Sequence, residues 1–205
     1  MIVGIVGGIA GGKSAAAAAL AAATEGELIQ ADRLAHETLR EPAVRDAIAE
    51  RFGPNVLTTD GEVDRRRVAA LVFGPEPEKA ASLEWLESLI HPRVRTAAEE
   101  RIRSVQAAEP NRLIVLDVPL LLEAGWAERC DRIVYIDTPR DLHRRLAAAR
   151  GWSEQHLSDR EAKQWSLEHK RAAASDVLVN DGTIDQLLVS ARLLANRLLA
   201  DGPRR

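Results

Sequence analysis

The sequence has 205 residues, and its 28 lysines and arginines against 31 aspartates and glutamates give a formal net charge of −3. This length allows one hydrophobic core, or one core with an insertion. Without a basic field, we expect no nucleic-acid partner. The single cysteine excludes an internal disulfide and fits a reducing cytoplasm. No apolar run approaches the length of a membrane span, so we expect neither membrane association nor a signal peptide.

The first predicted elements are an apolar strand over residues 2–6 and an alanine-rich helix over 15–23. Between them, residues 7–14 (GGIAGGKS) match the phosphate-binding pattern G-x-x-x-x-G-K-[ST] at every fixed position. Glycines let backbone N–H groups converge on phosphate oxygens, and the helix N-terminus adds partial positive charge. Lys13 would bind the β and γ phosphates of ATP, and Ser14 would ligate Mg²⁺. The predicted nucleotide-binding residues here are Gly8, Ala10, Gly11, Gly12, Lys13, Ser14 and Ala15.

A second strand is predicted over residues 27–31, ending at Asp32, and helical spacing follows over 33–40. Further on, His91-Pro92 predicts a boundary between two helices, because the residue before a proline avoids helical geometry. Residues 41–110 are predicted to be almost all helix. They form an insertion between two strands of one sheet, a usual place for an acceptor substrate to bind.

The remaining predicted elements are strands over 113–118, 133–136 and 176–180, helices over 139–150, 153–174 and 184–198, and a frayed tail over 201–205. Five strands alternating with helices predict an α/β fold with a doubly wound parallel sheet. Ligands of such sheets bind beyond the carboxyl ends of the strands. The phosphate loop, Asp32, Asp117 and Asp137 all fall at that edge.

Two aspartates at this edge each have two interpretations. Asp32 can orient an acceptor hydroxyl and take its proton, or it can cap the helix that follows. Asp117 can hold Mg²⁺ through water, as the aspartate that follows a neighbouring strand does in other phosphate-loop proteins, or it can cap a turn. The sequence alone leaves both pairs of interpretations open.

The segment 139–175 is basic, with eight lysines and arginines against five acidic residues. It can close over a triphosphate as a lid, or it can be a solvated pair of charged helices. Trp152, at the tip of this hairpin, can pack on a nucleotide base or serve burial. The chain has no Asn-Lys-x-Asp element of the kind that reads guanine in switch GTPases, which favours a kinase.

Six elements together resemble bacterial dephospho-CoA kinase, a phosphate-loop kinase of the nucleoside monophosphate kinase-like group, over nearly the whole chain. They are residues 4–14, Ala31-Asp32, residues 89–95 (LIHPRVR), residues 116–123 (LDVPLLLE), Arg160 with Gln164, and residues 175–182 (SDVLVNDG). The phosphate loop alone would not select this family. The His-Pro-x-Val-Arg and Pro-Leu-Leu-x-Glu elements are far more specific.

The resemblance implies that ATP, with Mg²⁺, phosphorylates the ribose 3′-hydroxyl of dephospho-CoA to give coenzyme A. It implies a nucleotide-binding core over 1–40 and 111–205, with a lid at about 139–175, and a CoA-substrate-binding insertion over 41–110. The implied catalytic residues are Asp32, Lys13 and Arg145. Arg144, Arg150 and Asn180 would bind the nucleotide, Asp32, His91, Arg95, Pro119 and Leu120 the substrate, and Ser14 and Asp117 the metal. We expect a cytoplasmic monomer.

The chain departs from the family pattern at several points. Leu142 stands where the family usually has a glutamine, and the spacing from Arg145 to Arg150 is one residue longer. Two further departures bear on the phosphate loop and the metal. The family usually has an aspartate where this chain has Gln30, and a glycine where it has Ala10, although alanine avoids a positive φ. If magnesium needed the missing carboxylate, Asp117 can compensate for it. A kinase of another nucleotide or small metabolite, and a nucleotide-dependent switch without an acceptor, are the alternative functions.

Overall fold

The computed structural model describes residues 1–74, 76–162 and 164–203, except for the side chain of His156. Lys163 of the basic segment and residues 204–205 of the predicted tail therefore lie outside the described residues. The chain forms two compact units. One comprises residues 1–30 and 104–205, and the other comprises residues 31–103.

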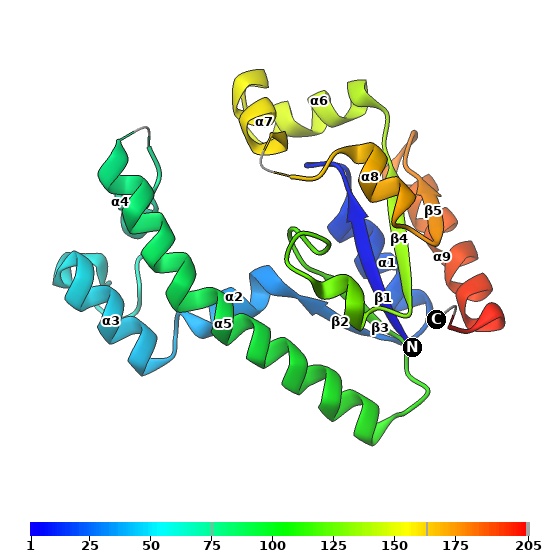
Figure 1. Cartoon of the computed structure of the whole chain (residues 1–205), viewed down its shortest axis with the longest axis horizontal. Helices are drawn as coiled ribbons and strands as arrows, with labels where there is room; N and C mark the ends of the chain where they lie inside the picture. Colours follow the sequence, from blue (N-terminus) through cyan, green and yellow to red (C-terminus); the bar gives the residue numbers. More distant parts are fainter. Residues whose placement is uncertain (75, 163, 204–205) are drawn as a thin grey trace. The chain divides into compact units, whose positions relative to one another are not determined.

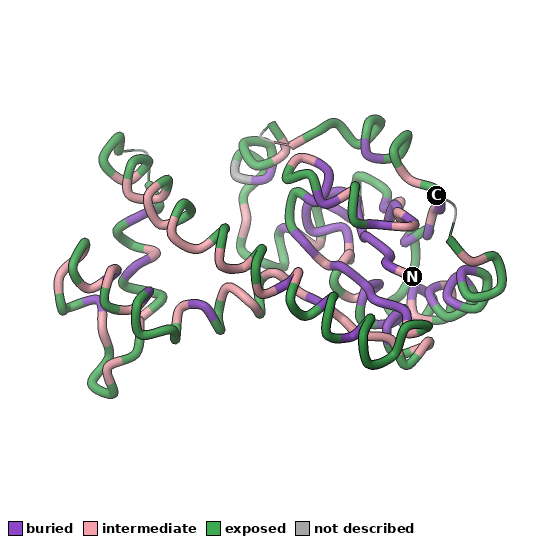
Figure 2. The backbone as a smooth tube through the Cα atoms, turned by 60° about the horizontal axis from the view of Figure 1, so that its bottom comes forward, coloured by how far each residue is buried: buried purple, intermediate pink, exposed green. Residues whose placement is uncertain are grey.

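The first unit is built on a five-stranded parallel sheet, in the order β2-β3-β1-β4-β5 (Figure 1). Its strands are β1 (Ile2–Gly7), β2 (Glu27–Gln30), β3 (Ile114–Asp117), β4 (Arg132–Asp137) and β5 (Asp176–Val179). The central strands are continuous apolar runs because helices cover both faces of a parallel sheet. Figure 2 shows these strands as buried. The doubly wound α/β fold predicted from the sequence is confirmed.

Two long helices pack on each other and on the sheet: α1 (Lys13–Ala23) and α9 (Ile184–Asp201). The alanines of α1 let its backbone approach the sheet closely, and Leu20 is fully buried there. A capping box begins α9, since Thr183 and Gln186 each bond to the other's backbone. Asp201 is the last residue of this helix, so the predicted tail was placed one residue too early: among the described residues, 202 and 203 follow the helix.

The predicted helix over 153–174 is two helices, α7 (Glu154–Glu161) and α8 (Leu167–Ala172), which follow α6 (Arg140–Ala149). The backbone N–H of Trp165 donates to the carboxylate of Glu123 at 2.8 Å, instead of to a helical carbonyl. Ser166 then caps α8 by accepting from the His169 N–H.

The second unit is helical and has its own small core. It contains α2 (Ala31–Thr38), α3 (Pro42–Phe52), the short 3-10 helix η1 (Pro54–Val56), α4 (Arg65–Val72) and most of α5 (Pro77–Ala108), as far as Arg103. Val44, Ile48 and Val68 are buried at its centre, and Trp85 packs against them. Asp64 caps α4 by accepting two backbone N–H groups.

The helix boundary predicted at His91-Pro92 was wrong, because Pro92 lies inside the continuous helix α5. A proline in a helix removes one backbone hydrogen bond and crowds the preceding turn. Pro92 lacks the N–H that would donate to the Ser88 carbonyl, and the Arg93 guanidinium donates to the next carbonyl of that turn, that of Leu89, at 2.7 Å. Apolar residues at helical spacing before and after Pro92 favour a continuous helix.

An ion pair buried at the amino end of β4 joins the sheet to its last helix. Arg132 is 1% exposed, and its Nε lies 3.3 Å from Asp176 at the start of β5. Its second guanidinium nitrogen lies 3.3 Å from Asp201 at the end of α9. Arg197 is an exposed partner of the same Asp176, at 3.7 Å. Two buried charges are tolerated here because each has the other as its partner.

We predict that Arg132→Met lowers the free energy of unfolding by about 3–5 kcal/mol, because it leaves the Asp176 carboxylate buried without its main cation. Urea unfolding measures this change. The matched control is Arg197→Met, which removes the exposed partner and should cost about 1 kcal/mol or less. Equal losses in the two variants would contradict this account of the pair.

Candidate active site

The phosphate loop joins β1 to α1 and is shaped by left-handed glycines. Gly12, at φ 81°, precedes the first residue of α1 and so aims the amino end of that helix into the loop. The Gly11 N–H donates to the Gly8 carbonyl at 3.1 Å. The Lys13 ammonium folds back onto the same carbonyl, at 2.8 Å. The loop is therefore a preformed turn with its backbone N–H groups gathered at a helix N-terminus.

Side chains from beyond β4 and β5 hold this loop from outside. The Thr138 hydroxyl donates to the Gly11 carbonyl at 2.8 Å, and the Asn180 amide donates to the same oxygen at 3.1 Å. His143 of α6 is buried against the loop, where a Cβ added to Gly8 would lie 2.0 Å from its ring. Burial lowers the pKa of this histidine below its ordinary value, so its ring is neutral.

Sequence reasoning missed the loop-holding role of Thr138 and His143. The available signal was weak, because Thr138 differs from an ordinary strand-end residue only by its hydroxyl. Asn180 was predicted to bind the nucleotide. Its side chain is buried and bonds to the phosphate loop, and its role in nucleotide binding stays a prediction.

Ala10 has a φ of 58°, in the left-handed region that disfavours any side chain. Its methyl group is nevertheless buried, in a small apolar cluster with Ala147 of α6 and Leu157 of α7. The backbone strain of about 1 kcal/mol is thus offset by a similar gain from burying one methyl group. The departure from glycine is accommodated by packing between the loop and these two helices.

We predict that Ala10→Gly changes the free energy of unfolding by less than about 1 kcal/mol, because relief of strain and loss of packing nearly cancel. Ala10→Val should cost at least about 2 kcal/mol, because a β-branched residue resists a positive φ. Urea unfolding of both variants tests this. A cost above 2 kcal/mol for the glycine variant would show that the strain is negligible.

Lys13 is the most electrostatically perturbed group of the site. Its pKa is lowered to about 8, most of all by burial and next by the neighbouring cation Lys170, while Asp117 opposes the shift. Arg150 lowers the pKa of Lys13 and Glu123 raises it, each by less than the groups named above. A phosphate anion in the loop would favour the charged form of Lys13 and so raise its pKa.

We predict that nucleotide binding takes up a proton above pH 8, and that affinity falls up to tenfold per pH unit above that value, because Lys13 is then neutral before binding. Calorimetry of ADP binding at pH 8.5, in two buffers of different ionisation enthalpy, measures the proton uptake. Lys13→Arg stays charged and should take up none. Constant wild-type affinity from pH 7.5 to 9.5 would contradict the prediction.

The residues proposed for the metal lie around the end of β3. Asp117 is its last residue and accepts a hydrogen bond from the Gln30 amide at 3.2 Å, across the β2–β3 pairing. Gln30 therefore places a hydrogen-bond donor at the position where the family usually has an aspartate. Ser14 is exposed in the first turn of α1. Among the described residues, no cluster of three or more acidic, histidine or cysteine side chains forms a cage for a metal. A hydroxyl and one carboxylate do suit Mg²⁺, which keeps several waters and phosphate oxygens as ligands.

The lid residues lie on α6 and just after it. Arg144 and Arg145 are exposed, and Arg144 lies 3.3 Å from Glu154 of α7. Arg150 follows α6, and its guanidinium lies 5.8 Å from the ring centroid of Trp152. Arg160 lies over the same ring at 4.6 Å. The indole therefore contacts two cations, which ties α6 to α7.

The remaining predicted substrate residues are exposed. Pro119 and Leu120 follow β3, where Leu120 has a φ of 55°. In the second unit, Asp32 lies in the first turn of α2, and His91 and Arg95 lie on α5. Asp32 follows the last residue of β2 by two positions, so the chain itself keeps it within about 8 Å of the carboxyl end of the sheet. Their roles in substrate binding stay predictions.

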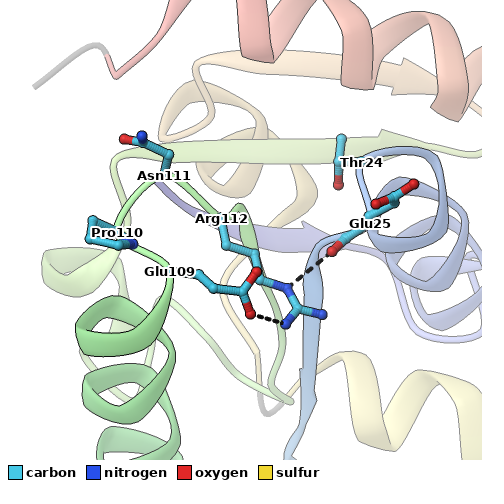
Figure 3. A pocket seen from close by; sticks show the side chains of 6 residues that line it. All are labelled: Thr24, Glu25, Glu109, Pro110, Asn111 and Arg112. Carbon is cyan, nitrogen blue, oxygen red and sulfur yellow. Dashed lines mark hydrogen bonds and ion pairs between the residues drawn. The ribbon is translucent and has the colours of Figure 1, made fainter.

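An open hollow of about 370 Å³ lies at the opposite end of the sheet. Figure 3 shows Arg112 there, bonded to the Glu25 carbonyl and to the carboxylate of Glu109. Its lining residues precede β3 or follow α1, at the amino ends of the strands. Ligands of parallel sheets bind at the other edge, so this hollow is not the candidate site.

The family model described as "Dephospho-CoA kinase" matches residues 1–186. The chain belongs to the dephospho-CoA kinase family. The resemblance predicted from the six sequence elements is therefore confirmed. No helix among the described residues has the length and apolar character needed to cross a membrane.

Curated relatives and solved structures agree with this membership. The dephospho-CoA kinase of Rhodopirellula baltica is 36% identical over 186 residues, which cover 91% of this chain and 85% of the relative. That of Chlorobaculum tepidum is 38% identical, with 91% and 89% covered. A crystal structure from Thermus thermophilus is 34% identical with a TM-score of 0.70, covering 98% and 97%. A Campylobacter jejuni dephospho-CoA kinase structure, at 20% identity and TM-score 0.72, covers 98% of both chains and supports the fold.

Proposed function

We propose that this chain transfers the γ-phosphoryl group of ATP to the ribose 3′-hydroxyl of dephospho-CoA, giving coenzyme A and ADP. Family membership over residues 1–186, together with an intact phosphate loop, carries the proposal. A bond forms between the 3′-oxygen and the γ-phosphorus, and the bond from that phosphorus to the β–γ bridging oxygen breaks. The proton of the hydroxyl passes to a carboxylate of the chain.

The nucleotide side of this site is the phosphate loop and its helix. The backbone N–H groups of residues 8–15 would bind the phosphates, with the positive end of α1 beneath them. Lys13 would exchange its bond to the Gly8 carbonyl for phosphate oxygens. Because positioning and charge stabilisation dominate phosphoryl transfer, a preformed loop supplies much of what the reaction needs.

The metal would be held by the Ser14 hydroxyl and, through water, by Asp117. When bound, Mg²⁺ neutralises phosphate charge. The chain's own contribution is to present these two oxygens at neighbouring points of the sheet edge. The Gln30 amide fixes the orientation of the Asp117 carboxylate through its 3.2 Å hydrogen bond.

The acceptor side would be formed by Asp32 and the helical unit. Asp32 would accept the proton of the 3′-hydroxyl, and its position directly after β2 supports this role. We propose that the insertion predicted over 41–110, with His91 and Arg95, binds the CoA substrate. Pro119 and Leu120 would contact the same substrate from the β3 edge.

The lid would be formed by about residues 139–175, which contain α6, α7 and α8. Arg145 would neutralise charge that develops during transfer, and Arg144 and Arg150 would bind the nucleotide phosphates. Their exposure supports a role that begins only when a ligand is bound. Closure of such a segment also excludes water from the reaction.

We further propose that the chain acts as a cytoplasmic monomer without a nucleic-acid partner. Its net charge of −3 and single buried cysteine support this.

We predict that Asp32→Ala lowers kcat for dephospho-CoA by at least 100-fold and leaves the Kd of ADP within threefold, because the carboxylate acts on the acceptor only. Coupled detection of ADP release and calorimetry measure the two quantities. The control is Asp60→Ala, which changes an exposed aspartate of the same unit and should leave both unchanged. Near-normal turnover of the Asp32 variant would overturn this role of Asp32.

A further inference from the structure

Lys170 of α8 is a buried cation to which the reaction above assigns no part. It is 4% exposed, although lysine is seldom buried without a partner. Its ammonium lies 3.2 Å from the Glu123 carboxylate and 2.6 Å from the side-chain oxygen of Gln164. The Trp165 N–H donates to the same carboxylate oxygen of Glu123 at 2.8 Å. These contacts make a compact, charge-balanced cluster.

The cluster lies beside the phosphate loop. Helix α8 packs against β1, the strand that runs into the loop (Figure 1). Of the charged groups around Lys13, Lys170 lowers its pKa the most, while Asp117 and Glu123 raise it and Arg150 lowers it. Lys13 therefore has two acidic neighbours, Asp117 of β3 and Glu123 of the segment after it. Its two basic neighbours are Lys170 of α8 and Arg150 at the end of α6.

Neither acidic neighbour is paired with Lys13 in the part of the chain that the structure describes. Asp117 is held by Gln30, at 3.2 Å. Glu123 is held by Lys170 and by a backbone N–H. Burial raises the pKa of Glu123, but these hydrogen bonds and the Lys170 charge outweigh it and keep that pKa below its ordinary value, so the carboxylate is ionised. Lys13 itself bonds to the Gly8 carbonyl, a neutral group that a phosphate can displace.

We propose that Lys170 is a positioning residue of the phosphate site: by holding Glu123, it keeps Lys13 without a carboxylate partner and available to nucleotide phosphates. The proposal rests on the role of Lys13 in nucleotide binding given above. Without Lys170, Glu123 is a buried carboxylate without a cation, and Lys13 is the cation that can pair with it. Nucleotide then binds only the fraction of molecules in which that pair is broken.

ADP binding with Mg²⁺, measured by calorimetry at pH 7.5 on the full chain without any acceptor, tests this. Lys170→Met keeps the length of the apolar stem and removes the charge, and it should weaken ADP binding at least tenfold. Adding Glu123→Gln to that variant removes the competing carboxylate and should restore the Kd to within threefold of wild type. Arg112→Met is the matched control, since it removes a partly buried cation paired with Glu109 at the other end of the sheet, and it should leave the Kd unchanged.

Rescue by the second substitution separates this role from a merely structural one. A loss of folding in Lys170→Met would also weaken ADP binding, but Glu123→Gln would not reverse that loss. Failure of Glu123→Gln to restore affinity would overturn the proposal, and would instead make Lys170 a direct phosphate ligand.

If Lys170→Met does not fold, Glu123→Gln is compared with the double variant. Once Glu123 is neutral, Lys170 should contribute nothing to affinity, so the two Kd values should agree within threefold, and a tenfold gap would overturn the proposal. These measurements use no acceptor, so they do not depend on whether dephospho-CoA is the substrate. Absence of ADP binding by the wild-type chain would instead refute the proposed function itself.

Discussion

The bond between the Lys13 ammonium and the Gly8 carbonyl is the contact on which the rest of the site depends. It keeps a cation inside a loop whose own N–H groups also attract anions, although burial makes that charge costly. Two nearby acids, Asp117 and Glu123, favour the charged form of Lys13 and so reduce this cost. Each acid is bound by another group, so the Lys13 charge is not neutralised. A triphosphate would then supply the missing negative charge.

Three side chains from different parts of the first unit contact the phosphate loop. Thr138 and Asn180, beyond two different strands, bind one carbonyl of the loop, and His143 packs on it from α6. Helix α6 therefore contacts the loop through one face and carries Arg144 on another. This arrangement links the position of the lid helices to the shape of the phosphate site, and the strained Ala10 lies where the two meet.

Local patterns in the sequence predicted most of the fold. Apolar runs and the phosphate-loop motif depend on neighbouring residues, so the parallel sheet was predicted correctly. The two errors have different causes: the Trp165 N–H donates to Glu123, a tertiary contact, where the predicted helix over 153–174 is interrupted, whereas α5 simply continues through Pro92. At the site, the spacing of Lys13 and Ser14 was visible, whereas the bond from Gln30 to Asp117 exists only because β2 lies beside β3.

The measurement that tests the central claim most directly is ADP release by the wild-type chain with ATP, Mg²⁺ and a panel of acceptors. The panel contains dephospho-CoA, nucleoside monophosphates, shikimate and simple sugars. The account predicts acceptor-stimulated ADP release with dephospho-CoA at least 100-fold above that with any other member, and a coenzyme A product phosphorylated at the ribose 3′-oxygen. Preference for another acceptor, or slow hydrolysis that no acceptor stimulates, would contradict it.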